Sequence, residues 1–297
     1  MSALPLFPPS PYRMVVCDLD GTLVSHTLGV SPAVRRVVAL INAQPHLHML
    51  IATGRMHPSA LLYAHELGLM DEPVISYQGA MACLPAPDAA PLLHQPIAHP
   101  TGLALGELCR SEGFHLNAYC NNVLHSQPHP VYVEEYRRTA RIEPTVVDDI
   151  RTVLDVTPSS KMVIIERDPE RMAHLRQLIA TDFGNRVTLC LSRPHFLELT
   201  QSGVTKWTAV AHVAQTLNIP PEAIVCVGDQ ENDLSMISQA GLGIAMGNAP
   251  DNVKAQAKLV TASVEADGAA EALAQHVLGM SLAEVMALPA EVLPVPC

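Results

Sequence analysis

One short segment constrains the fold of this chain more than any other. An apolar run, Met14–Cys17, ends abruptly in two carboxylates, Asp18 and Asp20, and then a glycine, Gly21. The run is apolar on both of its alternating faces, which predicts a strand buried inside a parallel sheet. Residues two apart in a strand point to the same side, and Gly21 allows a tight turn beside them. The segment therefore predicts a pair of acids at the carboxyl end of a buried strand.

Strand-like and helix-like segments alternate along most of the remaining chain, joined by short connections. This alternation is typical of an α/β fold with a Rossmann-like, doubly wound parallel sheet. The helices are expected within residues 31–44, 59–69, 204–219 and 249–257, and the further strands within 46–55, 73–80, 223–233 and 237–246.

The alternation is interrupted in the middle of the chain. At 297 residues the sequence exceeds the usual size of one domain, and five prolines break the pattern between residues 83 and 102. Beyond them we expect further strands, including a hairpin that turns at Asn121 and Asn122. The predicted organisation is a discontinuous core at 12–83 and 196–285, an inserted α+β domain at 84–195, and loose proline-rich tails at 1–11 and 286–297.

Composition and charge argue against several classes of protein. Apolar residues make up 48% of the chain and charged residues 16%, which argues against intrinsic disorder. A net charge of -11 offers no basic face, so nucleic acid is not an expected partner. Seven cysteines without a C-x-x-C pattern indicate reduced thiols. No apolar run approaches the ~20 residues of a membrane helix, and no signal peptide is recognisable, so we expect a cytoplasmic protein without a membrane partner.

Polar side chains follow three of the expected strands. Any one of these groups is explained by a turn or a helix cap, because Asp, Asn and Thr favour such positions. Ligands of an open parallel sheet, however, lie beyond the carboxyl ends of its strands, so agreement among three strand ends predicts one common site. The groups are Asp18 with Asp20, then Thr53 with Gly54 and Arg55, then Asp229 with Asn232 and Asp233.

These residue types predict attack on phosphorus with the help of a metal. Two close carboxylates repel each other unless a cation joins them, and Mg²⁺ prefers oxygen ligands, with Asp229 as a further carboxylate. A carboxylate beside Mg²⁺ can form an aspartyl phosphate, while a second aspartate protonates the leaving oxygen and later deprotonates water. The equatorial phosphoryl oxygens would be held by Thr53, Gly54 and Lys206, the last in the first turn of a helix.

Five segments, in this order and spacing, carry a resemblance to a known family: DLDGTL, ATGR, SGVTK, GDQEND and GIAMGNAPDNVK. As a set they resemble the haloacid dehalogenase superfamily, specifically its Cof-type phosphatases, over most of the chain outside the insertion. The resemblance implies a Rossmann-like core, a Mg²⁺ cofactor, and an α/β cap in the inserted segment that closes over the site and reads the rest of the substrate.

The resemblance also implies a role for each motif residue. Asp18 would be the nucleophile and Asp20 the general acid and base. Mg²⁺ would be bound by Asp18, the backbone carbonyl of Asp20 and Asp229. The remaining implied roles are phosphoryl binding by Thr53 and Lys206, support of the metal site by Asn232 and Asp233, and a further phosphate contact from Asn232.

Two positions depart from the pattern of these phosphatases. Gln78 precedes Gly-Ala where Asn is usual, which alters either a substrate-facing hydrogen bond or only the structure of its loop. Trp207 follows Lys206 where Gly is usual, and this bears on helix packing more than on the lysine.

Other reactive side chains have plainer interpretations. Cys17 alternates to the face opposite the nucleophile, which predicts a buried core thiol. The fourteen histidines show no spacing typical of a zinc site, and His125 and His195 remain candidates for contacting substrate. Arg55 is expected to form a salt bridge that ties its loop, in preference to binding phosphate.

The expected function is Mg²⁺-dependent hydrolysis of small phosphomonoesters, such as sugar phosphates or related metabolites, through phospho-Asp18. A phosphotransferase or phosphomutase with the same intermediate is the alternative, distinguished by whether the phosphoryl group ends on water or on a second substrate. A phospho-accepting, receiver-like signalling module also clusters acids, a Thr and a Lys around Mg²⁺, but needs neither a second aspartate nor a lid. A binding protein on an inactive phosphatase scaffold is less expected, because every motif residue is present. The expected partner is a small phosphorylated metabolite, and the sequence gives no sign of oligomeric state.

Overall fold

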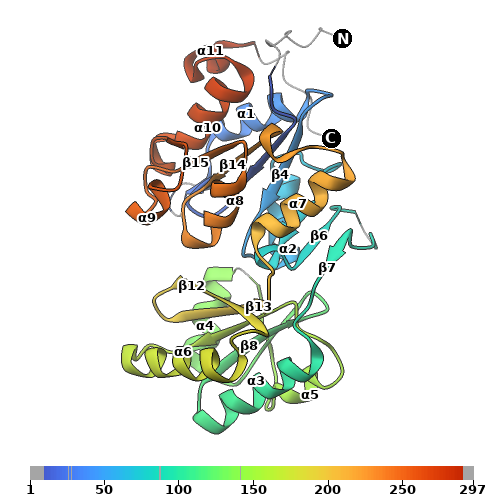
Figure 1. Cartoon of the computed structure of the whole chain (residues 1–297), viewed down its shortest axis with the longest axis vertical. Coiled ribbons are helices and arrows are strands. Elements are labelled where there is room, and N and C mark those ends of the chain that lie inside the picture. The colour runs from blue at the N-terminus through green and yellow to red at the C-terminus, as the bar shows by residue number, and fades with distance from the viewer. Residues whose placement is uncertain (1–9, 26, 28, 87, 141, 290–297) are drawn as a thin grey trace.

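The computed structural model describes residues 10–25, 27, 29–86, 88–140 and 142–289. These residues form two large sheets, one above the other in Figure 1, and one two-stranded sheet. The chain passes from the upper sheet to the lower one near residue 95 and returns near residue 202. Most of the predicted loose tails lie outside the described residues, although α11 (Leu282–Ala287) reaches into the range predicted for the second tail.

The upper sheet is the Rossmann-like core that the alternation predicts. It has eight strands in the order β16-β15-β14-β1-β4-β5-β6-β7. All pairs from β16 to β5 are parallel, and only β6 and β7 are antiparallel. Its strands are β1 (Met14–Cys17), β4 (His48–Ala52), β5 (Val74–Ser76), β6 (Met81–Cys83), β7 (Leu93–His94), β14 (Ile224–Gly228), β15 (Leu242–Ala245) and β16 (Leu259–Val260).

Helices cover both faces of this sheet, as the doubly wound prediction requires. One face packs against α1 (Pro32–Asn42), α2 (His57–Glu66), α10 (Gly268–Leu273) and α11. The other packs against α7 (Lys206–Thr216) and α8 (Leu234–Gln239). The side chains of β1 alternate between the two cores, and Cys17 is fully buried in the first of them, which confirms its interpretation as a core thiol. The short helix α9 (Asp251–Lys254) and the hairpin of β2 (Val24–Ser25) and β3 (Gly29–Val30) complete this domain.

The lower sheet and its helices form the domain that we call the cap. Its six strands have the order β10-β9-β8-β11-β13-β12. Helices α3 (His99–Glu112), α5 (Arg151–Leu154) and α6 (Pro169–Phe183) pack on one face, and α4 (Pro130–Ala140) packs on the face toward the core. The strands are β8 (His115–Cys120), β9 (Val123–Ser126), β10 (Thr145–Val146), β11 (Lys161–Ile165), β12 (Val187–Arg193) and β13 (Phe196–Gln201).

The hairpin predicted in the cap is present in the structure, whereas the predicted boundaries of the cap differ from the observed ones. The hairpin of β8 and β9 turns at Asn121 and Asn122, whose φ angles of 50° and 58° are the left-handed values of a tight two-residue turn. The predicted start of the second core segment at residue 196 falls at the first residue of β13, which pairs with β11 and β12. The predicted start of the cap at residue 84 is also too early, because β7 pairs with β6 in the core sheet. Sheet pairing therefore shifts both ends of the cap to later residues.

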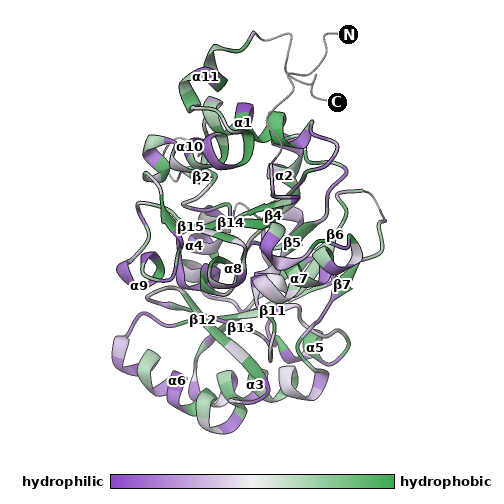
Figure 2. Ribbon diagram, turned by 45° about the horizontal axis from the view of Figure 1, so that its top comes forward, coloured by the Kyte–Doolittle hydropathy of each residue, from purple (hydrophilic) through white to green (hydrophobic). Residues whose placement is uncertain are grey.

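The core and the cap share an apolar contact. Met56 and Tyr77 of the core belong to one cluster with Tyr119, Val163 and Phe196 of the cap. The apolar colouring in Figure 2 is concentrated on the central strands of both sheets, whereas the helices carry hydrophilic residues as well. In the described part of the chain, no helix combines the length and the hydropathy needed to cross a membrane.

Candidate active site

Three neighbouring strands bring predicted site residues to one edge of the core sheet. β1 lies between β4 and β14 and runs parallel to both, so the carboxyl ends of the three strands meet. Asp18, Thr53 and Asp229 follow these strands and are 5%, 1% and 3% exposed. The sheet therefore gathers, at one buried edge, polar groups that are far apart in the sequence.

Lys206 joins two acids at this edge. Its Nζ donates to Oδ1 of Asp18 at 2.5 Å and to Oδ1 of Asp233 at 2.7 Å, and its side chain is fully buried. The hydroxyl of Thr205 accepts from the backbone N–H of Thr208, which caps α7 and fixes the lysine in the first turn. Burial disfavours the charge of Lys206, but the two carboxylates outweigh burial and raise its pKa.

The ionisation of Asp18 is opposed by its surroundings. Burial raises the pKa of Asp18 well above its usual range, Lys206 lowers it, and Asp233 and Asp229 raise it again. Attack on phosphorus requires the ionised carboxylate. One lysine shared among three acids does not balance their charge, so this edge favours binding of a further cation.

One carboxylate oxygen of Asp229 has no hydrogen-bond partner among the residues that the structure describes. Oδ2 accepts from the side chains of Gln230 and Asn248 at 3.0 and 3.1 Å, but Oδ1 is buried without a hydrogen-bond partner. Burial and the neighbouring Asp233 raise the pKa of Asp229 to about 7. A buried polar atom without a partner is costly, and a divalent cation would satisfy both the orphaned oxygen and the excess charge.

Two of the three clustered acids are candidates to bind a metal directly, and the third has a supporting role. Carboxylate oxygens of Asp18, Asp229 and Asp233 lie within 4.8 Å of one another. Asp233, however, already uses both oxygens: Oδ1 accepts from Lys206, and Oδ2 accepts from the backbone N–H groups of Asp229 and Gln230 at 2.9 and 3.0 Å. Asp18 and Asp229 therefore fit Mg²⁺ as direct carboxylate ligands, and Asp233 holds the loop that carries Asp229.

Asp20 forms an ion pair with Arg55. The guanidinium donates from Nε to Oδ2 at 2.7 Å and from Nη2 to Oδ1 at 2.6 Å, and it also lies over the ring of Tyr63. The structure thus contains the salt bridge expected of Arg55. Asp20 is 34% exposed in its side chain, unlike the deeply buried Asp18. Proton exchange at Asp20 has to compete with this two-point contact.

Gly21 permits the close approach of Asp229 to the first strand end. Its φ is +83°, and a Cβ atom there would lie 2.3 Å from Oδ2 of Asp229. Asn248 ties the same two elements together, because its Nδ2 donates both to Oδ2 of Asp229 and to the carbonyl of Gly21. Sequence analysis did not single out Asn248, although it follows β15 just as Asp229 follows β14 and the same strand-end rule would have found it.

The loop after β4 supplies the remaining predicted phosphate ligands. Thr53 is buried at the base of the site, and its hydroxyl accepts from the backbone N–H of Arg55 at 3.1 Å. The carbonyl of Gly54 accepts from Nζ of Lys161, a cap residue, at 2.7 Å. The predicted phosphate-binding loop is therefore also a place where the cap contacts the core.

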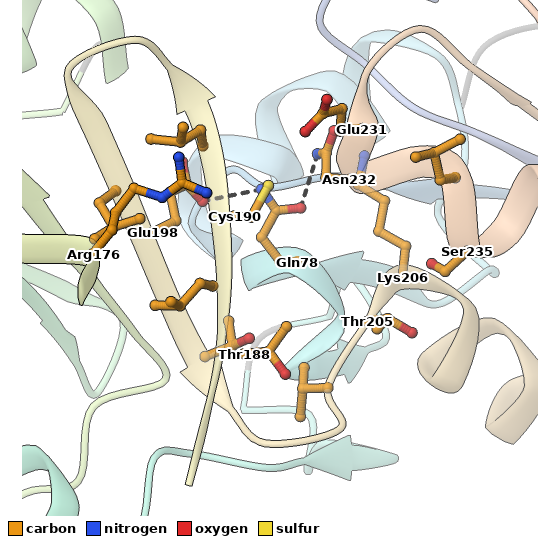
Figure 3. A pocket seen from close by; sticks show the side chains of 16 residues that line it. Gln78, Arg176, Thr188, Cys190, Glu198, Thr205, Lys206, Glu231, Asn232 and Ser235 are labelled. Atoms are coloured by element: carbon orange, nitrogen blue, oxygen red, sulfur yellow. Dashed lines mark hydrogen bonds between the residues drawn. The ribbon is translucent and has the colours of Figure 1, made fainter. Parts of the chain in front are cut away.

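A pocket of about 350 Å³ lies between the cap and the core and reaches Lys206, but neither Asp18 nor Thr53 is among the residues that line it (Figure 3). The core contributes Lys206 and Asn232 to its wall, and the cap contributes Arg176 and Cys190. Burial and the nearby Glu198 raise the pKa of the Cys190 thiol to about 12, so Cys190 stays protonated and unreactive. The pocket is of a size for a small metabolite.

The other predicted side chains lie elsewhere or have structural roles. Trp207 packs into the apolar cluster between α7 and the sheet, so the bulky residue after Lys206 is accommodated. His195 pairs with Glu135 at 3.0 Å, and neither His195 nor His125 lines the pocket. Within the described residues, the acidic cluster is the single group at metal-binding distance, and it contains no histidine.

Comparison with known proteins decides the family. The model of the haloacid dehalogenase-like hydrolases matches residues 15–273. The chain belongs to this family. This confirms the Cof-type phosphatase resemblance, and the chain is a hydrolase acting on phosphoric monoesters.

Relatives of this hydrolase span nearly its whole length. A 5-amino-6-(5-phospho-D-ribitylamino)uracil phosphatase from Bacillus subtilis is 26% identical over 90% of this chain and 97% of its own. A pyridoxal phosphate phosphatase from Escherichia coli is also 26% identical, over 90% and 99%. A crystal structure from Thermotoga maritima superimposes with a TM-score of 0.79 at 29% identity, covering 89% of this hydrolase and 97% of that chain. The likeness thus extends over the core and the cap together.

Proposed function

We propose that this phosphatase hydrolyses small phosphorylated metabolites, such as sugar phosphates, through a covalent phosphoryl intermediate on Asp18 and with Mg²⁺ as cofactor. The observation that carries the proposal is the arrangement around Asp18: Lys206 contacts it directly, and the orphaned oxygen of Asp229 lies in the same acidic cluster. Two curated relatives are named for phosphorylated small molecules, and the pocket volume agrees with such a substrate. We place the reaction in the cytoplasm, a setting with which the free thiols of the described cysteines agree.

The first step transfers the phosphoryl group to the protein. An oxygen of Asp18 attacks phosphorus, the ester bond breaks, and the leaving oxygen takes a proton from Asp20. Lys206 and the Thr53–Gly54 loop hold the phosphoryl oxygens as negative charge spreads over them. The two hydrogen bonds from Arg55 hold the Asp20 carboxylate near the site.

The second step regenerates the free carboxylate of Asp18. Asp20, now ionised, removes a proton from a water molecule, which attacks phosphorus and releases inorganic phosphate and the Asp18 carboxylate. Mg²⁺, held by Asp18, Asp229 and the carbonyl of Asp20, would neutralise the acids and the phosphoryl charge in both steps. A closed cap would exclude bulk water while the leaving group departs.

Replacement of the nucleophile tests the proposal. Asp18→Asn should lower release of inorganic phosphate from p-nitrophenyl phosphate by about 10⁴-fold or more, because a whole covalent pathway is lost. Asp71→Asn, which changes an exposed acid, is the matched control and should keep full activity. Circular dichroism should show both variants folded. Substantial turnover by Asp18→Asn would contradict the mechanism.

A second measurement separates hydrolysis from phosphoryl transfer. During turnover in water enriched in ¹⁸O, a hydrolase places one solvent oxygen in each phosphate released from the intermediate. Added sugars or other alcohols should not accumulate phosphoryl groups. Efficient transfer to such an acceptor would support the phosphotransferase alternative and overturn the proposed hydrolysis.

A further inference from the structure

Gln78 links the cap to the core through both ends of its side-chain amide. Nε2 donates to Oε2 of Glu198 on β13 at 3.0 Å, and Oε1 accepts from Nδ2 of Asn232 at 2.9 Å. Figure 3 shows the two contacts as dashed lines on opposite sides of Gln78. Asn232 lies in a short 3₁₀ turn, Glu231–Asp233, directly after the loop that carries Asp229. One glutamine therefore contacts a cap acid and a predicted phosphate-binding residue at the same time.

A buried ion pair in the cap fixes which way this amide points. Glu198 also accepts from Nζ of Lys161 at 3.0 Å, and the two side chains are 8% and 3% exposed. Burial disfavours charge on Glu198, but Lys161 and the hydrogen bonds to Glu198 outweigh it and hold the pKa of this acid below its usual value. An ionised carboxylate can only accept hydrogen bonds. Gln78 must therefore turn its NH₂ group toward Glu198.

The orientation of Gln78 determines that of Asn232. With Nε2 directed to the cap, Oε1 of Gln78 faces Asn232 and can only accept, so Asn232 must present its own NH₂ group. One of the two hydrogens on Nδ2 is used by this contact. The second hydrogen and Oδ1 remain available to a molecule in the pocket, which Asn232 and Lys206 both line. A charge pair in the cap thus sets the orientation of a side chain in the core.

The loop of Gln78 is held tightly from two sides. Tyr77 and Gln78 both have left-handed backbone conformations, with φ of 53° and 60°, which ordinary side chains adopt rarely. A Cβ atom on Gly79 would lie 2.1 Å from the carbonyl of Thr205, next to the start of α7. A Cβ atom on Gly54 would lie 2.4 Å from Nε2 of Gln78. The amide is therefore packed against the predicted phosphate-binding loop, with little freedom to move elsewhere.

We propose that Gln78 is a positioning residue that orients Asn232 toward a bound phosphoryl group only while the cap is docked on the core. If the cap moves away, Glu198 leaves with it, and the amides of Gln78 and Asn232 lose the charge that fixed their direction. The phosphate site is then complete only in the docked state. The inference deepens the proposed function and rests on it in one respect, the contact between Asn232 and phosphate.

A double-mutant cycle with Gln78→Asn and Asn232→Ala tests the coupling. Asn tolerates the left-handed backbone but is one methylene too short to reach both partners. The readout is binding of inorganic phosphate in the presence of Mg²⁺, measured by calorimetry, which requires no turnover. Gln78→Asn should weaken phosphate binding about fivefold to tenfold, the value of roughly one hydrogen bond. In the Asn232→Ala background, Gln78→Asn should cause no further loss.

Additive losses in the cycle, or an unchanged affinity in Gln78→Asn, would overturn the proposal. Gln44→Asn applies the same substitution to a buried glutamine in the core whose amide donates to the carbonyl of Leu40, and it should leave phosphate affinity unchanged. Thermal unfolding should show similar stability for Gln78→Asn and Gln44→Asn. Because the readout is binding, a failure of the coupling is distinguishable from a failure of hydrolysis, which only the Asp18→Asn experiment reports.

The cap side of the link has its own test. The double substitution Lys161→Met with Glu198→Leu removes the charge pair without leaving a buried unpaired charge. This double substitution should weaken phosphate binding by about the same factor as Gln78→Asn does. In the Asn232→Ala background it should cause no further loss of phosphate affinity. Wild-type phosphate affinity in this variant would show that the cap pair does not orient the amides, and would overturn the proposal.

Discussion

Two buried lysines, one in each domain, serve different purposes. The chain has only four lysines, and Lys161 and Lys206 are 3% and 1% exposed. Lys206 contacts two acids of its own domain, Asp18 and Asp233. Lys161 contacts one acid of its own domain, Glu198, and a backbone carbonyl of the other, at Gly54. The first lysine lies inside the proposed active site of the core, and the second connects the cap to that site.

The number of acids around each buried lysine determines whether apolar residues can replace its ion pairs. The Lys161–Glu198 pair is one positive and one negative charge, so an apolar pair can stand in for it. Lys206 contacts two buried acids, so the negative charges around it exceed its own positive charge. Its removal leaves Asp18 and Asp233 buried without a cation. We expect the core to depend on its lysine for both stability and chemistry, and the cap to depend on its own mainly for docking.

The largest effect is expected from Lys206→Met. Leaving buried carboxylates unpaired should lower the free energy of unfolding by about 3–5 kcal/mol. Loss of the proposed phosphoryl-binding cation should lower kcat/KM by roughly 10³-fold. Urea denaturation and hydrolysis of p-nitrophenyl phosphate measure the two effects. Lys258→Met, an exposed lysine of the same domain, is the control. Comparable losses in both variants would show that burial of Lys206 is not the cause.

The next effect is expected from the metal. Saturating the acidic cluster with Mg²⁺ at about a hundredfold excess over its Kd should stabilise the protein by about 2.7 kcal/mol. Chelation with EDTA should remove this stabilisation together with activity. Asp229→Asn should abolish most of the gain, while Asp71→Asn should keep it. An equal Mg²⁺ effect in both variants would argue against the orphaned oxygen of Asp229 as a ligand.

A smaller effect on stability is expected in the cap when the pH is lowered. Burial lowers the pKa of His115 to about 4, and the groups around its ring are Asn117, Ser126, His129 and Tyr132. In the unfolded chain the pKa of His115 returns to its usual value of about 6.5. As the pH falls from 6.5 toward 4, protonation of His115 therefore favours the unfolded state, and the folded cap loses stability. From pH 7.5 to pH 5 the loss should be about 2 kcal/mol.

Denaturation of the whole chain at the two pH values, followed by a probe in the cap, measures this loss. His115→Gln removes the titrating group and should reduce the pH dependence by the same amount. His174→Gln, at an exposed position of α6, should leave it unchanged. A pH dependence that survives His115→Gln would assign the effect to other groups.

The smallest effect on stability is expected from replacing the cap pair. Lys161→Met combined with Glu198→Leu should change the free energy of unfolding by no more than about 1–2 kcal/mol, because the cost of desolvating two charges disappears with their attraction. Each single substitution should destabilise more than the double one. If the double variant lost as much stability as Lys206→Met, the proposed difference between the two lysines would be wrong.

Local patterns predicted the elements and the strand ends of this molecule well. The apolar runs before Asp18 and Asp229 are buried parallel strands, and the Asn121–Asn122 turn forms a hairpin, because these signals depend only on neighbouring residues. The remaining predictions about the site came from the family motifs. Arg55 was expected to form a salt bridge, and it pairs with Asp20.

Contacts between domains could not be predicted in the same way. Lys161 and Glu198 lie in apolar strands of the cap, and nothing near them in the sequence indicates that they pair. Gln78 stood out only as a departure from a motif, and its two partners are 120 and 154 residues away. The domain boundary at 196 likewise depended on strand pairing, which assigns β13 to the cap.

The contact between Lys206 and Asp18 also has a consequence for the growing chain on the ribosome. The two residues are 188 positions apart, and the whole cap is synthesised between them. Asp18, the proposed nucleophile, is therefore synthesised long before Lys206, and the contact between them cannot form on a chain that ends before α7. A truncated product that ends before residue 206 would contain the DLDGTL segment and still lack a working site.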